Sequence, residues 1–518
     1  MERLLQAARR VSLEDAGGWR AALFLIFLLG MCVRFLVYTD LTDKPAGRIE
    51  EWFGSEPWFY AELGKKIVER NDWSLAGRNL LITREMLNAA PERDWARWSG
   101  NKLPRGALGV FILAGSFGMT ASLALYKLLS CVAGAMVGVC CAGAAAFLFG
   151  NRRVGFLAGI GINSLQASII ASLYPGPWVW EALAFSSLLL LYARIRNGGQ
   201  GITGDWLLFG VIAGLAIWLR PLFHWAPILA LVGILSASLR EGENWKRHLA
   251  GVAAMAVSFV LLAAGLSVRN ASVHATKAPI VGQQGWEFLL NTNPGAVLGP
   301  AVPADAAVID AAGGSFARAL TVASQVGSYT KAAPRVLTRK LRELVGARDV
   351  ASSINADYVE ARSRLLGLMG LTSDVAMAAG WGAIALLVIL RRFPKPLAVV
   401  MGILLGHGLL FGTSGLDRLL LVLCFAMLGG AGFVIAWEER RRVAAMPFVF
   451  LALWGVAQLL LQVDDHARGS RYRAADFIAA ASDYRRSGDE REFREELKAM
   501  ERVRLTEADM EGYWNAQR

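Results

Sequence analysis

The chain has 518 residues, of which 55% are apolar and 19% are charged, and its 54 Lys and Arg against 42 Asp and Glu give a net charge of +12. An average soluble domain has roughly a quarter charged residues, so this composition excludes an ordinary soluble enzyme, a disordered chain and a disulfide scaffold. Nucleic-acid binding is also disfavoured, because the basic residues are spread over short connectors rather than gathered in one patch with interleaved aromatic residues.

Apolar runs close to the roughly 20 residues that cross a bilayer recur along the chain. The clear ones are 21–39, 206–219, 252–266, 375–390, 396–411, 419–436 and 448–461. The segment before the first run is too long and too mixed in charge for a signal peptide, so we expect this run to remain as a membrane helix.

The basic connectors predict the topology, because Lys and Arg collect in cytoplasmic loops. With a cytoplasmic N-terminus, every basic cluster between spans falls on the cytoplasmic side: 151–153, 193–200, 239–248, 391–395 and 438–442. The alternation predicts an all-α polytopic membrane protein of about 11 transmembrane helices, with region 108–149 crossing once beside a short flanking helix.

Two large segments, 40–104 and 268–371, and the C-terminus then lie on the outer face. We expect a transmembrane domain over 1–462 and an amphipathic helical tail over 463–518. Because the cytoplasmic connectors between spans are short, chemistry is expected on the outer face of the membrane.

The five cysteines lie in apolar stretches and are expected to be small packing residues. The five histidines are scattered and offer no metal-ligand spacing. We therefore expect no metal and no other cofactor.

The first outer segment contains candidate acid–base residues. Glu56 and Tyr60 are one helical turn apart on an expected surface helix, and Glu51 comes shortly before them. A partly desolvated carboxylate at a membrane interface can act as a general base on a hydroxyl. The alternative, favoured by the pattern alone, is a solvated acidic face.

Cations and other polar residues gather at the outer ends of the expected spans. Lys102 and Arg105 could bind a lipid phosphate or serve as interfacial anchors. Glu181 lies within an apolar run, which makes it a functional candidate. Either Glu181 or Asp417 could instead form a structural ion pair with a nearby Arg. The further candidates at outer span ends are Arg220, Arg269, Asn270 and Arg418.

The combined pattern resembles the GT-C superfamily of glycosyltransferases that use polyprenyl-phosphate sugars, in the branch with lipid A aminoarabinose transferase and the protein O-mannosyltransferases. The first outer segment carries Glu56, then Tyr60-Ala61-Glu62, then Asn71-Asp72-Trp73, and Lys102-Leu103-Pro104 stands where the family has a Lys-Pro-Pro-Leu-like element. The later matches are the glycine-rich span ending in Arg220-Pro221, the pair Arg269-Asn270, the loop 291–296 with Asn293, and Asp417-Arg418. The usual first-loop Asp is Glu56 here, and Leu103 replaces the first Pro.

The resemblance implies a GT-C-like helical bundle in the inner (plasma) membrane, with its active site on the periplasmic side. It also implies an inverting transfer of a sugar from a polyprenyl monophosphate to an acceptor hydroxyl on lipid A, envelope polysaccharide or protein. It implies Glu56, or else Glu51, as general base, with Glu181 orienting the sugar or acceptor. By the same resemblance, a set of cations would bind the donor phosphate, and a set of polar side chains would bind the rest of the substrate. The cations are Lys102, Arg105, Arg220, Arg269 and Arg418, and the polar side chains are Tyr60, Asn270, Asn293 and Asp417.

Two other functions stay open. An O-antigen ligase or polymerase would use a polyprenyl diphosphate donor, and a lipid or solute transporter would carry charges deep in several spans. We expect a monomer that contacts membrane lipids, the lipid-linked sugar donor and a glycan, lipid or protein acceptor, with no nucleic-acid partner.

Overall fold

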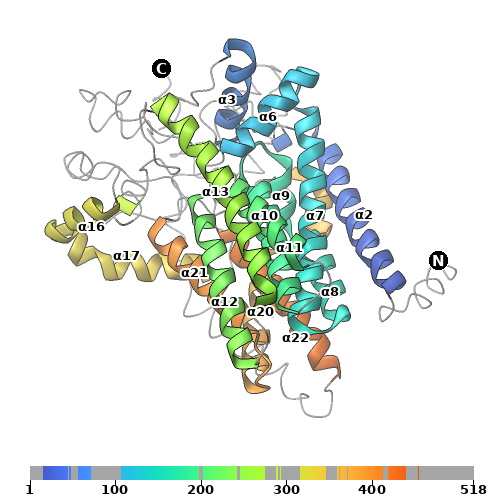
Figure 1. The fold of residues 1–518 in the computed structure, drawn as a ribbon. Coiled ribbons are helices and arrows are strands. Elements are labelled where there is room, and N and C mark those ends of the chain that lie inside the picture. The colour runs from blue at the N-terminus through green and yellow to red at the C-terminus, as the bar shows by residue number, and fades with distance from the viewer. Residues whose placement is uncertain are drawn as a thin grey trace.

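A computed structural model shows a bundle of packed helices (Figure 1). It describes residues 16–44, 46–47, 56–71, 107–197, 202–241, 246–274, 288–289, 292, 316–345, 359–360, 362–369, 371–411, 418–438 and 453. The helices are α2 Ala16–Leu41, α3 Glu56–Arg70, α6 Ala107–Thr120, α7 Ala124–Phe149, α8 Arg152–Asn163, α9 Gln166–Leu173, α10 Trp178–Arg196, α11 Ile202–Ala216, η2 Pro221–Trp225, α12 Ala226–Glu241, α13 Lys246–His274, α16 Phe316–Gln325, α17 Gly327–Val345, α19 Arg364–Met369, α20 Ser373–Ile389, α21 Lys395–Phe411 and α22 Leu419–Glu438.

The chain is an all-α membrane protein, as the apolar runs predict. Five described helices are long and apolar enough to cross a bilayer, namely α2, α7, α10, α13 from residue 248 to 269, and α22. Five shorter apolar helices accompany them: α6, α11, a segment of η2 and α12, α20 and α21. The predicted span 448–461 lies outside the described residues except for Leu453, and the predicted tail 463–518 lies wholly outside them.

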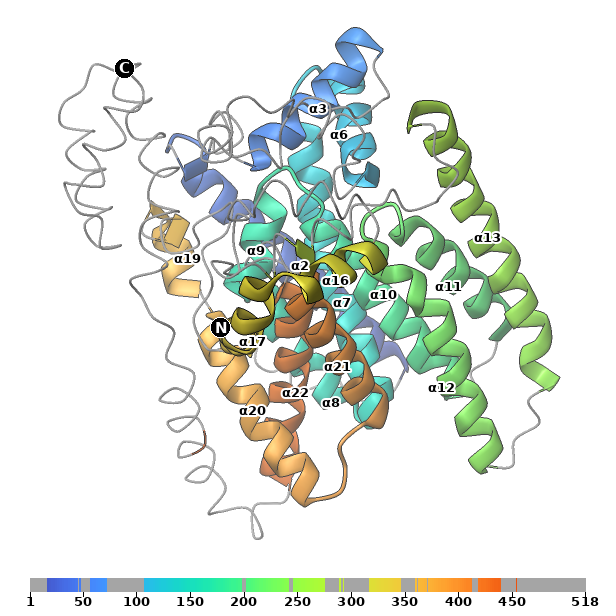
Figure 2. The same cartoon turned by 90° about the vertical axis from the view of Figure 1, so that its left-hand side faces the viewer.

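Helices α7, α10 and α22 are the most buried of the long apolar helices, and α2 and α13 are the least buried. Figure 1 shows α2 at one edge of the bundle, and Figure 2 shows α13 at another. The central helix α7 is rich in glycine, alanine and cysteine, which lets neighbouring backbones approach closely. Four of the five cysteines are buried and all five are free, which confirms their expected packing role except at exposed Cys32.

Exposed apolar side chains cover the peripheral helices. They include Phe24, Leu25 and Phe35 on α2, and Val257 and Leu261 on α13. A soluble protein rarely exposes a contiguous apolar surface of this kind, so these faces fit contact with lipid chains.

The region 107–149 contains a long helix, α7, and a shorter helix, α6, beside it. The turn from α7 to α8 follows from the sequence. Gly150 adopts a left-handed conformation (φ 63°), which glycine reaches without steric cost. The Asn151 side chain then accepts a hydrogen bond from the Arg153 backbone N–H and so caps α8.

The next segment, which the sequence predicts to be one crossing, is broken into α8 and α9 at Ser164 and Leu165. Leu371, just before α20, pairs with this break: its N–H donates to the Ser164 carbonyl (3.1 Å), and its carbonyl accepts from the Gln166 N–H (3.1 Å). Non-helical backbone at membrane depth is tolerated where protein covers it and satisfies its polar groups. Residue 371 therefore ties the end of the second large segment into the bundle.

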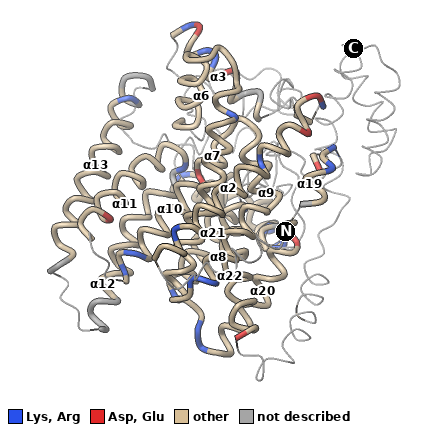
Figure 3. The backbone as a smooth tube through the Cα atoms, turned by 90° about the vertical axis from the view of Figure 1, so that its right-hand side faces the viewer, with Lys and Arg blue, Asp and Glu red and all other residues tan. Residues whose placement is uncertain are grey.

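The basic connectors meet at one end of the bundle. The Asn151 amide donates to Glu438 (3.2 Å), and the Asn197 amide donates to the Phe147 carbonyl (3.0 Å). We call this end, formed by the C-termini of α7, α10 and α22 and the N-termini of α8 and α21, the basic end. Most charged positions lie toward the helix ends in Figure 3. The sequence predicts that the basic end is cytoplasmic.

Candidate functional site

The end opposite the basic end contains a buried ion pair. Arg220 Nη1 lies 3.3 Å from Glu181 Oε2, and the two side chains are 2% and 6% exposed. Glu181 stands in the first turn of α10, where the helix N-terminus favours a negative charge. Arg220 follows the end of α11, and Pro221 directly after it opens the short helix η2. The contact is the one that the ion-pair alternative predicts for Glu181.

Aromatic residues bring three further elements to this pair. The Tyr60 ring of α3 contacts Trp178 of α10 edge-on, with centroids 6.2 Å apart. The Phe111 ring of α6 contacts Trp218 in the same way at 5.9 Å. The Arg269 guanidinium of α13 lies 5.9 Å from the centroid of the Phe111 ring. Helices α3, α6, α10, α11 and α13 therefore meet at one end, and we call this meeting point the end-face site.

A backbone contact fixes the position of α6 in this site. The Leu108 N–H donates to the Trp218 carbonyl (3.2 Å), so α6 is joined to the chain just before Arg220. Arg269 is partly buried, so it reaches the site from the lipid-facing helix α13 without being enclosed.

Tyr126 holds the turn before α10. Its hydroxyl donates to the Gly176 carbonyl (2.9 Å) and accepts from the Trp180 indole N–H (3.1 Å). Tyr126 is fully buried on α7. These bonds fix the turn that positions Glu181. The sequence reasoning did not single out Tyr126, because an aromatic residue at the start of a span resembles an interfacial anchor.

A second polar cluster joins the end of α2 to the second large segment. Asp40 forms an ion pair with Lys44 (2.8 Å) and accepts a hydrogen bond from Ser363 (2.8 Å). The Lys44 ammonium also donates to the Arg362 carbonyl (2.8 Å). The contacts to Arg362 and Ser363 join residues more than 300 positions apart and place segment 362–369 beside the end of α2.

Four of the predicted site residues therefore come together, namely Tyr60, Glu181, Arg220 and Arg269. Arg418 is buried directly before α22, whose other end lies at the basic end, so it belongs to the same end of the bundle as the pair. Glu56 is the first residue of α3 and Asn270 lies in α13, but their side chains are outside the described part. The remaining predicted site residues, Glu51, Lys102, Arg105, Asn293 and Asp417, lie outside the described residues.

Arg34 is a buried cation that the sequence reasoning missed. It lies in α2, is fully buried, and donates to the Ser168 hydroxyl (2.8 Å), the Ser172 hydroxyl (3.1 Å), the Asn163 side-chain oxygen (3.2 Å) and the Gly30 carbonyl (3.1 Å). We call these residues the Arg34 cluster. The sequence does mark Arg34, because it is a charge inside the apolar run 21–39 and such a charge is a functional candidate.

The end-face site brings two arginines and one carboxylate together. A buried guanidinium beside a carboxylate is held in one orientation, and Arg269 adds a second cation that approaches over an aromatic ring. Among the described residues, no group of three His, Cys, Asp or Glu side chains could hold a metal ion.

Comparisons with known proteins give little further information. No protein-family model matches the chain, and no curated protein matches its sequence. Among solved structures, the chain is similar to an apo oligosaccharyltransferase from Archaeoglobus fulgidus, with 12% sequence identity and a TM-score of 0.41. The match covers 94% of this chain and 60% of that one, so the chain spans less than two thirds of that protein's length. We assign no function from this likeness.

Proposed function

We propose that the protein is a membrane glycosyltransferase that moves a sugar from a polyprenyl monophosphate to an acceptor hydroxyl, with inversion at the anomeric carbon. The observation that carries the proposal is the meeting of Tyr60, Glu181, Arg220 and Arg269 in the end-face site. These residues come from four separate helices or helix ends. The motifs that resemble the GT-C superfamily include Tyr60, Arg220 and Arg269, and Glu181 is a carboxylate within an apolar run.

The donor phosphate would interact with fixed cations. As the glycosidic bond to the phosphate breaks, negative charge grows on the leaving phosphate, and preorganised cations stabilise that charge. Arg269 suits this role because it is partly buried and lies over Phe111. Arg220 is held by Glu181, so we assign Glu181 to positioning Arg220 rather than to orienting the sugar.

The general base is proposed to be Glu56, with Glu51 as the alternative. Position 56 precedes Tyr60 by one helical turn on α3, and Tyr60 contacts Trp178 one turn before Glu181. The face of α3 that carries positions 56 and 60 is therefore the face that meets α10. A base placed there would accept the proton of the acceptor hydroxyl as the hydroxyl oxygen attacks the anomeric carbon.

The test uses the purified full-length protein in lipid nanodiscs, with a panel of polyprenyl monophosphate and diphosphate sugars, lipid A and short peptides as acceptors, and mass spectrometry of the products. We expect product only with a monophosphate donor. Product from diphosphate donors alone would indicate the ligase or polymerase reaction. If the protein binds the donor and moves it into vesicles but forms no product, it is a transporter.

Carboxylate variants then identify the base. Glu56→Gln should lower the transfer rate by about 10²- to 10⁴-fold. Glu69→Gln is the matched control, because Glu69 lies on the same helix with its side chain exposed, and it should leave the rate unchanged. Full activity in Glu56→Gln together with loss in Glu51→Gln would move the assignment to Glu51.

Cation variants test the phosphate site. Arg269→Gln and Arg220→Gln should each lower kcat/KM by about 10²-fold or more. Arg153→Gln, an exposed cation at the basic end, serves as the control. As a positioning residue, Glu181 should respond differently: Glu181→Gln should raise KM for the donor more than it lowers kcat.

A further inference from the structure

A large apolar cavity extends from Arg196 and Lys395 at the basic end to Leu222 and Phe223 of η2, the short helix that follows Arg220. Its volume is about 870 Å³, and its walls come chiefly from α10, α12 and α21. Phe185, Leu188 and Leu189 of α10 are buried and form part of the lining. A cavity of this size and polarity is suited to a hydrocarbon chain.

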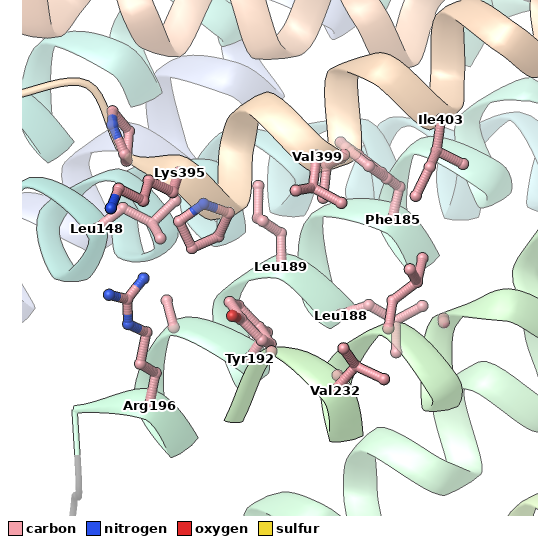
Figure 4. A pocket seen from close by; sticks show the side chains of 18 of the residues that line it. Leu148, Phe185, Leu188, Leu189, Tyr192, Arg196, Val232, Lys395, Val399 and Ile403 are labelled. Atoms are coloured by element: carbon pink, nitrogen blue, oxygen red, sulfur yellow. The ribbon is translucent and has the colours of Figure 1, made fainter. Parts of the chain in front are cut away.

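The cavity is open at the surface of the bundle. Val232 of α12 and Val399 of α21 line it and are 60% and 55% exposed. Figure 4 shows the two valines on opposite walls, with Leu188 and Leu189 between them. Because the walls are membrane helices, a chain can enter sideways from the bilayer.

Two cations stand at one end of this cavity. Arg196, in the last turn of α10, and Lys395, the first residue of α21, both line it and are exposed. Figure 4 shows their charged groups on the same side of the cavity, with the Tyr192 hydroxyl directed toward that side. The lining includes no Asp or Glu, and neither cation forms an ion pair with a carboxylate in the part of the chain that the structure describes.

We propose that this cavity binds an anionic phospholipid from the leaflet at the basic end, with one acyl chain between α10, α12 and α21 and the phosphate between Arg196 and Lys395. Charge complementarity selects the occupant. Basic pockets between membrane helices at headgroup level bind anionic lipid heads, and each Lys or Arg near the surface contributes to that binding. The two cations lie at the opposite end of α10 from Glu181, and the proposal does not depend on the proposed function.

Arg194 supports the assignment by contrast. It lies two positions before Arg196 on α10, but it is paired with Asp205 at 3.0 Å and does not line the cavity. One helix end thus carries one arginine neutralised by a carboxylate and another facing the apolar cavity.

The test is native mass spectrometry of the full-length protein in detergent, titrated with dioleoyl phosphatidylglycerol or with dioleoyl phosphatidylcholine. The two lipids have the same chains and differ in net charge. We expect phosphatidylglycerol to bind at least about 10-fold more tightly than phosphatidylcholine, because the two cations would contact its anionic headgroup. The double variant Arg196→Gln/Lys395→Gln should abolish this preference, and Arg153→Gln, a cation at the same end but outside the cavity, should retain it.

Filling the cavity gives a second, independent readout. Val232→Trp places a large side chain at the exposed rim and should weaken binding of both lipids. Equal binding of the two lipids by the wild-type protein would overturn the proposal, as would a preference that survives in the double variant. Displacement of phosphatidylglycerol by an equimolar amount of undecaprenyl phosphate would also overturn it, by assigning the cavity to a polyprenyl chain. Inorganic phosphate should not compete, because it cannot fill the apolar part.

Discussion

Two buried arginines in this molecule have opposite surroundings. Arg34 is in the interior of α2, and its four hydrogen bonds all go to neutral oxygens. Arg220 stands at a helix end and forms an ion pair with Glu181. In the first case fixed neutral acceptors hold the cation in place. In the second, a carboxylate holds the cation at a site where other charged groups also gather.

The different partners of Arg34 and Arg220 indicate different roles, a structural one for Arg34 and the proposed functional one for Arg220. The Arg34 cluster joins α2 to α8 and α9, and its acceptors are themselves fixed, because the Asn163 amide also donates to the Ile26 carbonyl (2.8 Å). An arginine used in this way braces the helices. The Glu181–Arg220 pair lies in the end-face site with Arg269 and the aromatic residues, where the proposed donor phosphate would share the cations.

The largest effect on stability is expected from Arg34→Ala. The variant leaves a cavity and removes the donors from several buried oxygens, so the free energy of unfolding should fall by about 4–6 kcal/mol. Unfolding of the purified protein in detergent, followed by tryptophan fluorescence, measures this change. Arg20→Ala is the control, because Arg20 lies on the same helix and is exposed. Equal stability of the two variants would contradict a bracing role.

Arg220→Met should have the next largest effect. It removes the cation that lies 3.3 Å from the Glu181 carboxylate, which should cost about 3–4 kcal/mol of unfolding free energy. The double variant Glu181→Gln/Arg220→Met should recover more than half of this loss while remaining inactive in sugar transfer. Arg194→Met breaks the partly exposed pair with Asp205 and should cost about 1 kcal/mol or less. A double variant as unstable as Arg220→Met alone would show that the pair is not the source of the loss.

Much of this arrangement could be predicted from the sequence. The apolar runs locate α2, α11, α13, α20, α21 and α22, and the Gly150-Asn151 step marks the turn between α7 and α8. Glu181 and Arg220 stand out because charges are rare in such runs. The break at Ser164 could not be predicted, because its backbone partner, Leu371, is some 200 residues away in the chain and the local sequence there continues as an apolar helix.

The partners of Arg34 could not be predicted from the sequence, for a different reason. The charge itself was visible in the first apolar run, but its partners are two serines and an asparagine, which are common in membrane helices and show no distinctive spacing. Only the packing of α2 against α8 and α9 shows that these side chains converge. A carboxylate partner is easier to anticipate, because few carboxylates occur near spans.

Gly138→Ala should destabilise the Arg34 cluster to an intermediate degree. A methyl group at position 138 of α7 would overlap the Asn163 side-chain amide, and such overpacking costs about 1–3 kcal/mol. Gly402→Ala is the control, because an added methyl group on α21 meets no atom within 4 Å. The same fluorescence measurement applies. If both alanine variants are as stable as the wild-type protein, the cluster is not tightly packed around Asn163.

Ser168→Ala should have the smallest effect and gives the sharpest distinction between the two arginines. It removes one acceptor of Arg34, at 2.8 Å, while the other three continue to hold the guanidinium, so about 1 kcal/mol of stability should be lost. Sugar transfer should be unchanged, because the cluster braces helices and touches no substrate. Ser267→Ala is the control, since the Ser267 hydroxyl bonds to the Ala263 carbonyl of its own helix. A large loss of transfer in Ser168→Ala without loss of stability would place Arg34 in the reaction and remove the distinction between the two buried cations.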